Sequence, residues 1–289
     1  MWLALAFLSA FLLGFYDVSK KYSLRNNAVI PILFLNTLFC SLIFLPLAFR
    51  TPFGGWEVQR YILLKACIVL SSWLLGYIGI KNLPITIVGP INATRPVMVL
   101  VGALIIFGER LNLMQWAGVL LAILSFFLLS RSGKKEGIDF KHNRWILCTV
   151  GAAILGAISG LYDKYLMASE SGLGLPRLTV QCWYNFYQCI MMGAMLLLLW
   201  WPKRKESTPF KWRWNILLIS VFLSIADYVY FYSLSLDGAL ISVVSMVRRS
   251  SVLVSFMLGA LLFHEKNLRS KAIDLALVLL SMFLLWLGR

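Results

Sequence analysis

The chain has 289 residues, of which 60% are hydrophobic and 13% charged, and its mean hydropathy is +0.81. This composition excludes a soluble globular protein and indicates an integral membrane protein. The formal net charge of +15 is explained by basic loops that face anionic lipid, and no basic and aromatic motif supports nucleic-acid binding.

Apolar runs long enough to cross a bilayer predict about ten membrane-spanning helices, separated by charged residues, Pro or Gly. The first run lacks the basic segment and cleavage site of a secretory signal, so we treat it as the first span. The predicted fold class is therefore an all-α integral membrane protein. The ten predicted spans are residues 2–19, 29–49, 61–80, 84–107, 113–130, 145–168, 177–201, 214–236, 238–263 and 270–287.

The fourth predicted span is rich in proline. Pro84, Pro90 and Pro96 fall at or within it, and Arg95 lies near its middle. Proline removes a backbone hydrogen bond and bends a helix, so this span is predicted to be a broken or kinked helix that lines a pathway.

The ninth predicted span carries two adjacent arginines, Arg248 and Arg249, near its middle. With a rise of 1.5 Å per residue they lie roughly 15 Å from the helix start, near the centre of a hydrocarbon core about 30 Å thick. An arginine at that depth costs roughly 2.5–3.5 kcal/mol on insertion scales. We therefore expect a polar cavity inside a helix bundle, lined by these side chains.

The loops are unequally basic, which predicts the orientation of the chain. Five residues of Lys and Arg lie in the loops on one side, namely Arg50, Arg60, Arg110, Arg177 and Arg289, or seven if Lys65 and Lys164 at span ends are added. Seventeen lie on the other side, which the positive-inside rule makes cytoplasmic, so that both termini are predicted outside. These are Lys20, Lys21, Arg25, Lys81, Arg131, Lys134, Lys135, Lys141, Arg144, Lys203, Arg204, Lys205, Lys211, Arg213, Lys266, Arg269 and Lys271.

The sequence also repeats itself. The motif GFYD at residues 14–17 recurs as GLYD at residues 160–163, an offset of 146, and an offset of 153 superposes Arg95 on Arg248. Two halves of five spans follow, and because five is odd the second half is inverted in the membrane relative to the first. Inverted repeats with a binding site at the midplane are typical of secondary transporters.

Each half resembles a known repeat. The segment PVMVLVGALIIFGERLNLMQWAGVLLAILSFFLLS of the first half and LGALLFHEKNLRSKAIDLALVLLSMFLLWLG of the second resemble the EamA repeat of the drug/metabolite transporter superfamily. The resemblance implies a ten-helix transporter of small organic molecules without covalent chemistry or a cofactor. Characterised ten-span members generally keep both termini in the cytoplasm, whereas the Lys and Arg distribution here places them outside.

The resemblance divides the chain into a first five-helix repeat (residues 1–130), a basic cytoplasmic loop (131–144) and a second five-helix repeat (145–289). The paired arginines of the ninth span are also similar to the Lys-Arg pair with which sugar-phosphate translocators bind phosphate, although only Arg248 and Arg249 match.

The candidate substrate-binding residues are three arginines and two residues of the eighth span. Arg95, Arg248 and Arg249 either contact substrate or form structural ion pairs, and their planar guanidinium groups suit a carboxylate or phosphate. Asp227 is either the counter-ion of an arginine, which we favour, or a buried carboxylate that couples transport to protons. Tyr232 is a candidate for the aromatic wall of the site.

Two further pairs, Tyr16-Asp17 and Tyr162-Asp163, occupy equivalent positions in the two halves. They are interpreted either as gates or coupling groups on the two faces, or as helix caps. Lys20 and Lys21 lie close enough along the helix to pair with Asp17.

Four amide side chains in spans two and seven are interpreted as interhelical hydrogen-bonding groups, and Gly156 and Gly160 as a site of close helix packing. The amides belong to Asn36, Gln181, Asn185 and Gln188.

Together these features predict a secondary transporter of the inner cell membrane that moves a small, anionic organic metabolite by alternating access. The coupling partner is a proton or a counter-substrate. An alternative is a proton-coupled exporter of neutral or zwitterionic compounds such as amino acids. A membrane-embedded enzyme is less consistent with the sequence, which has no nucleophile or metal constellation. No metal site is expected, because both histidines lie in loops.

Overall fold

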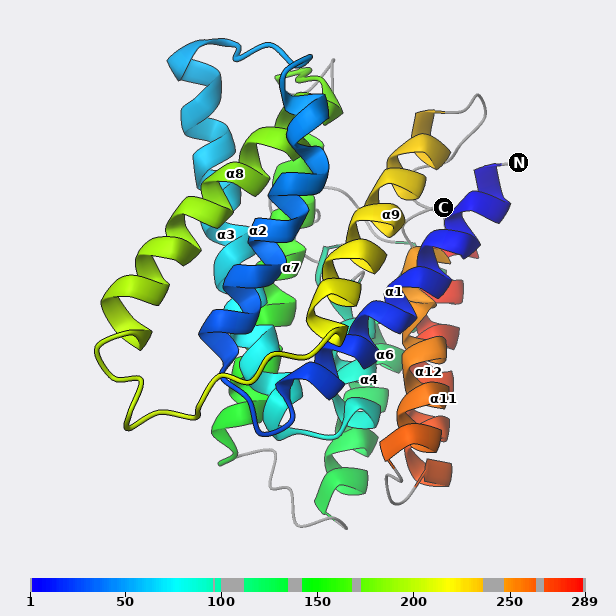
Figure 1. The fold of residues 1–289 in the computed structure, drawn as a ribbon. Helices are drawn as coiled ribbons and strands as arrows, with labels where there is room; N and C mark the ends of the chain where they lie inside the picture. Colours follow the sequence, from blue (N-terminus) through cyan, green and yellow to red (C-terminus); the bar gives the residue numbers. More distant parts are fainter. Residues whose placement is uncertain are drawn as a thin grey trace.

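The computed structural model describes residues 2–95, 97–99, 112–134, 142–167, 173–235, 247–263 and 268–287, which form ten α-helices and one π-helical turn with no strand among them (Figure 1). Within these ranges, five helices are long and apolar enough to cross a membrane. Many large apolar side chains face outward, such as Leu198 and Leu261, as contact with lipid requires. The predicted all-helical membrane class is confirmed.

The bounds of the helices follow the predicted spans with local differences. They are α1 (Trp2–Leu24), α2 (Val29–Ala48), α3 (Gly55–Asn82), α4 (Ile85–Ala93), α6 (Leu113–Lys134), α7 (Arg144–Met167), α8 (Arg177–Met195), the π-helical turn η1 (Leu196–Trp200), α9 (Asn215–Ser235), α11 (Ser251–Phe263) and α12 (Leu268–Leu287).

The differences have local causes. Helix α3 begins six residues before the predicted span because Gly54 and Gly55, with φ of 72° and 81°, turn the chain directly into it. It ends at Asn82 because Pro84 restricts Leu83 to an extended conformation. Helix α6 continues to Lys134, so the start of the predicted loop is helical. Residues 100–107 and 238–246 of the fourth and ninth predicted spans lie outside the described residues.

Each of the closest helix pairs joins one half of the sequence to the other: α1 with α9, α3 with α7, α2 with α8, and α6 with α12. If the five helices of the first half are matched in order to those of the second, the pair α1–α9 exchanges with α7–α3, and the other two pairs map onto themselves. The packing therefore has the pattern of a two-fold relation between the halves. Helices α1 and α7 run in opposite directions (Figure 1), as inversion requires.

Two glycine contacts repeat this relation at the level of single residues. A Cβ atom at Gly14 of α1 would overlap Val254 of α11, and one at Gly160 of α7 would lie 3.9 Å from Val99, which follows α4. Gly14 and Gly160 are the first residues of the repeated GFYD and GLYD motifs. The sequence repeat therefore corresponds to a structural one.

Loops on the basic side meet at one end of the molecule, which we call the basic end. Lys21 of α1 donates to the carbonyls of Ile80 (2.6 Å) and Leu83 after α3. Arg213, in the loop before α9, donates to the Tyr22 carbonyl at 2.6 Å. Helix α1 begins and α12 ends at the opposite end (Figure 1).

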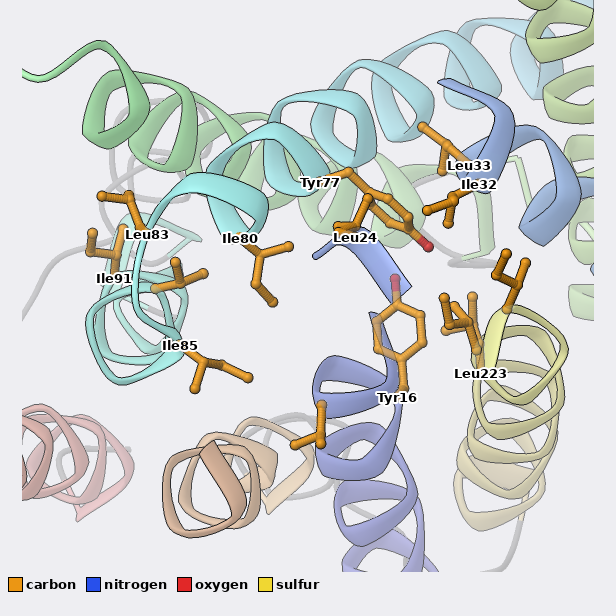
Figure 2. Packing of buried hydrophobic residues seen from close by; sticks show 14 of the residues in the cluster. Tyr16, Leu24, Ile32, Leu33, Tyr77, Ile80, Leu83, Ile85, Ile91 and Leu223 are labelled. Atoms are coloured by element: carbon orange, nitrogen blue, oxygen red, sulfur yellow. The ribbon is translucent and has the colours of Figure 1, made fainter. Parts of the chain in front are cut away.

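The apolar core lies between α1, α2, α3, α4 and α9 (Figure 2). Its buried aliphatic residues surround two tyrosines, Tyr16 of α1 and Tyr77 of α3, whose rings face the same space in Figure 2. This apolar core fills the middle of the bundle, next to the charged residues of α1.

Candidate functional site

The helices that carry the three arginines are both broken at a hydroxyl residue. Helix α4 ends at Ala93, and the N–H and hydroxyl of Thr94 both donate to the carbonyl of Ile91, at 3.2 and 2.7 Å. The helix then restarts, with the Val97 N–H donating to the Thr94 carbonyl. The interruption predicted for this span is confirmed, and it lies one residue before Arg95.

A matching interruption precedes α11. The N–H and hydroxyl of Ser250 both donate to the Val247 carbonyl, at 3.0 and 2.6 Å, and the Leu253 N–H donates to the Ser250 carbonyl. The N–H, hydroxyl and carbonyl groups of Thr94 form the same three kinds of hydrogen bond. Hydroxyl side chains that bond to a preceding carbonyl commonly bend helices. Interrupted helices at corresponding positions of two inverted halves mark the binding region in transporters of this architecture.

The correspondence between the breaks gives a second alignment of the arginines. Thr94 matches Ser250 at an offset of 156, so Arg95 corresponds to Ser251. This match differs from the offset of 153, which superposes Arg95 on Arg248. The arginines lie on opposite sides of their respective breaks, Arg95 after Thr94 and Arg249 before Ser250. The two halves thus bring guanidinium groups to the same region without repeating the residue itself.

Arg95 lies against α7. One guanidinium nitrogen donates to the Ala152 carbonyl at 3.3 Å, while Nε is buried and has no hydrogen-bond partner within the described residues. A Cβ atom at Gly156 would lie 2.7 Å from Arg95 Cζ, so the glycine makes room for the guanidinium. Gly156 was interpreted as a helix-packing position, and its neighbour in the structure is instead this charged side chain.

Arg248 forms an ion pair with Asp227 of α9, as the counter-ion interpretation of Asp227 predicts. The guanidinium of Arg248 also lies 4.2 Å from the ring centroid of Tyr230, a cation–π distance. Tyr232, which the sequence suggested for the wall, is 48% exposed. Tyr230, which the sequence did not single out, therefore lies against Arg248, while the place of Tyr232 in the wall of the site stays a prediction.

Arg249 is within electrostatic range of Arg95, Arg248, Tyr230 and Asp17. Among the described residues, no carboxylate lies at ion-pair distance from Arg249 or from Arg95. In the described part of the chain, Asp227 is thus the one carboxylate paired with the three guanidinium groups, and it pairs with Arg248. Such a cluster favours the binding of an anion.

Asp17 is paired within its own helix. The ammonium group of Lys20 lies 2.8 Å from the Asp17 carboxylate, and it is 4.4 and 5.3 Å from the ring centroids of Tyr16 and Tyr77. The pairing of Asp17 with a nearby lysine was expected. The ion pair stays within α1, and Lys20 reaches a second helix through the ring of Tyr77 on α3.

Asp163 is paired across the bundle. Its partner is Lys65 of α3, which is buried and also lies 5.0 Å from the ring centroid of Tyr184 on α8. The Tyr162 hydroxyl donates to the Tyr61 carbonyl at 3.2 Å, so α7 and α3 are held together twice at this end. Sequence spacing could not identify Lys65, which lies 98 residues away.

Comparisons with known proteins agree with this architecture. The model of the EamA-like transporter family matches residues 1–131 and 143–287. An uncharacterized transporter from Archaeoglobus fulgidus is 28% identical over 129 residues, which are 42% of this chain and 45% of that protein, so the match spans about half of the relative's length.

The fold also has a counterpart of known structure. A protein solved by crystallography superposes with a TM-score of 0.65 at 14% sequence identity, and the superposition covers 100% of this chain and 97% of the other. At that identity the likeness shows the fold alone. The family match extends over both halves of the sequence, and on that basis the chain belongs to the EamA-like transporter family.

Proposed function

We propose that this protein is a secondary transporter that moves a small organic anion across the membrane by alternating access of its two inverted halves. Arg95, Arg248 and Arg249 hold the anionic group, and Asp227 and Tyr230 position Arg248. The observation that carries the proposal is the imbalance of charge. Asp17 and Asp163 each have a lysine, Asp227 has Arg248, and Arg95 and Arg249 have no carboxylate at ion-pair distance among the described residues.

A guanidinium group offers several donors in one plane, which suits the oxygens of a carboxylate or phosphate. Movement of the substrate would be driven by a counter-substrate or ion gradient. The alternative of proton-coupled export through Asp227 is less well supported, because that carboxylate is already bound to Arg248.

The test separates stability from binding. Arg95→Met and Arg249→Met each remove a half-buried charge that has no carboxylate at ion-pair distance among the described residues, so we expect the melting temperature of the purified protein to stay unchanged or rise. Saturable uptake of carboxylated and phosphorylated metabolites into liposomes should fall roughly tenfold to a hundredfold, the equivalent of one charge-assisted hydrogen bond. Arg60→Met is the matched control, since Arg60 is exposed and its ion pair with Glu57 lies at the surface.

Arg248 should behave differently. Arg248→Met leaves Asp227, whose side chain is 14% exposed, without its ion-pair partner, and we expect a loss of stability of at most about 3–5 kcal/mol. The double variant Arg248→Met/Asp227→Asn should recover the stability while transport stays low. If Arg95→Met and Arg249→Met both transport anions at the wild-type rate, the anion site lies elsewhere.

A further inference from the structure

One face of α8 presents a row of buried polar side chains. Gln181 and Gln188 are 1% and 0% exposed, and Tyr184 lies between them. Residues separated by three, four and seven positions share one side of an α-helix, so the two amides flank the tyrosine ring above and below. The row is about two turns long.

The two amides are not satisfied by the protein. All four of their side-chain nitrogen and oxygen atoms are buried and lack a hydrogen-bond partner within the described residues. The interhelical hydrogen bonding expected for Gln181 and Gln188 is therefore wrong. A buried amide without a partner is unfavourable and uncommon in folded proteins. Gln59 of α3 provides a contrast, since it donates to the Phe53 carbonyl at 2.5 Å and accepts from the Tyr187 hydroxyl at 2.8 Å.

The row faces the charged centre of the bundle. The ring centroid of Tyr184 lies 5.0 Å from the ammonium group of Lys65, which forms an ion pair with Asp163. The amides beside it therefore share the face of α8 that is turned to charged residues inside the bundle. The backbone carbonyl of Asn185, the residue after Tyr184, accepts a hydrogen bond from the Ser41 hydroxyl of α2 at 3.0 Å. Helix α2 therefore contacts α8 to one side of the row.

We infer that Gln181 and Gln188 form a second subsite, which hydrogen-bonds the uncharged part of the substrate while the arginines hold its anionic group. This inference rests on the proposed function. An amide donates through nitrogen and accepts through oxygen, so the subsite suits hydroxyl or amide groups. The transported compound is then an organic anion with a polar, hydrogen-bonding body, and anions with a hydrocarbon body are poor substrates because they leave both amides unpartnered.

The first experiment compares Gln181→Met and Gln188→Met with the control Gln59→Met in detergent-purified protein. Methionine has a similar volume but no amide. We expect the melting temperature to stay unchanged or rise in the first two variants, because an unpartnered polar group is removed, and to fall by several degrees in Gln59→Met. If all three variants are destabilised alike, the row is structural and the inference is wrong.

The second experiment measures binding by thermal shift with two matched pairs of anions: gluconate against hexanoate, and glycerol 3-phosphate against propyl phosphate. Each pair shares charge and chain length and differs in hydroxyl groups. The wild type should prefer the hydroxylated member of at least one pair. Gln181→Met and Gln188→Met should reduce that preference about threefold to tenfold while binding of the alkyl member is unchanged.

The outcomes distinguish this subsite from the anion site. If the wild type prefers neither hydroxylated anion, or if its preference is unchanged in both variants, the inference is overturned and the anion site is left standing. If no anion of either pair binds the wild type, or if Arg249→Met binds them all normally, the proposed function fails and the subsite with it. A preference in the carboxylate pair alone, or in the phosphate pair alone, identifies the anionic group.

Discussion

Arg248 and Arg249 are neighbours in the chain but differ in their surroundings. Arg248 has a carboxylate and an aromatic ring, whereas Arg249 has two other guanidinium groups within electrostatic range. Removal of the positive charge is therefore expected to lower the stability of the protein at Arg248 and to raise it at Arg249. The difference explains why a single substitution at Arg248 cannot by itself report on binding.

Gly156 offers a test of how Arg95 is positioned. Gly156→Ala places a methyl group where the guanidinium now lies, which moves it away from the Ala152 carbonyl. Since the end of a flexible side chain can shift, we expect little change in melting temperature. The apparent affinity for transported anions should fall about tenfold, in line with the loss of one charged contact.

Gly160→Ala is the control on the same helix, because a Cβ atom there meets Val99 at an ordinary contact distance of 3.9 Å. Uptake assays should show wild-type affinity for Gly160→Ala. Equal affinities in both variants would mean that Arg95 does not touch the substrate.

At the scale of the element, the two helix breaks are the feature with the clearest internal symmetry. The side-chain hydroxyls of Thr94 and Ser250 each bond to a carbonyl three residues earlier. Ser250→Ala removes this bond, worth roughly 0.5–1.5 kcal/mol, and favours a continuous helix through the arginine pair. We expect the maximal rate of uptake to fall severalfold.

Ser255→Ala is the matched control, because the Ser255 hydroxyl bonds to the Val252 carbonyl at 3.2 Å inside the uninterrupted α11. The rate of this variant should equal that of the wild type. A loss of similar size in both would assign the effect to helix stability in general and not to the break.

Much of the element scale could be predicted from sequence, since spans, the interruption at the prolines and the repeat all depend on local pattern. The partners of the charged residues could not. Asp17 and Lys20 are three residues apart and were foreseeable, but the pairing of Asp163 with Lys65 depends on how α3 packs against α7. The contact of Tyr230 with Arg248 likewise depends on the rotation of α9, which an almost uniformly apolar helix does not reveal.

At the scale of the whole molecule, the basic loops and the chain termini lie at opposite ends, as the Lys and Arg distribution predicts (Figure 1). Among those of the seventeen counted residues whose side chains the structure describes, however, two do not face solvent. Lys20 and Lys271 are buried in helices, and Lys271 bonds to the Thr86 hydroxyl at 2.9 Å. The excess of Lys and Arg at the basic end remains large when these two residues are left out of the count.

The orientation in the cell can be measured by cysteine labelling in a variant without the five native cysteines. We expect Pro52→Cys, in the loop between α2 and α3, to react with an impermeant maleimide added to intact cells, because the positive-inside rule places that loop outside. Lys205→Cys, in the exposed loop before α9, should react only after the cells are permeabilised. The reverse pattern would show that the termini are cytoplasmic, as in characterised relatives.

The broken helices of the two halves also touch each other. A Cβ atom at Gly89 of α4 would lie 2.9 Å from Val252 of α11, and one at Gly259 of α11 would overlap Ile85 of α4. With no side chain to act as a spacer, neither helix can tilt without displacing the other. In the proposed alternating-access mechanism, opening of the site to one side would then be coupled to its closing on the other, which would keep the uncoupled leak of protons and small ions low.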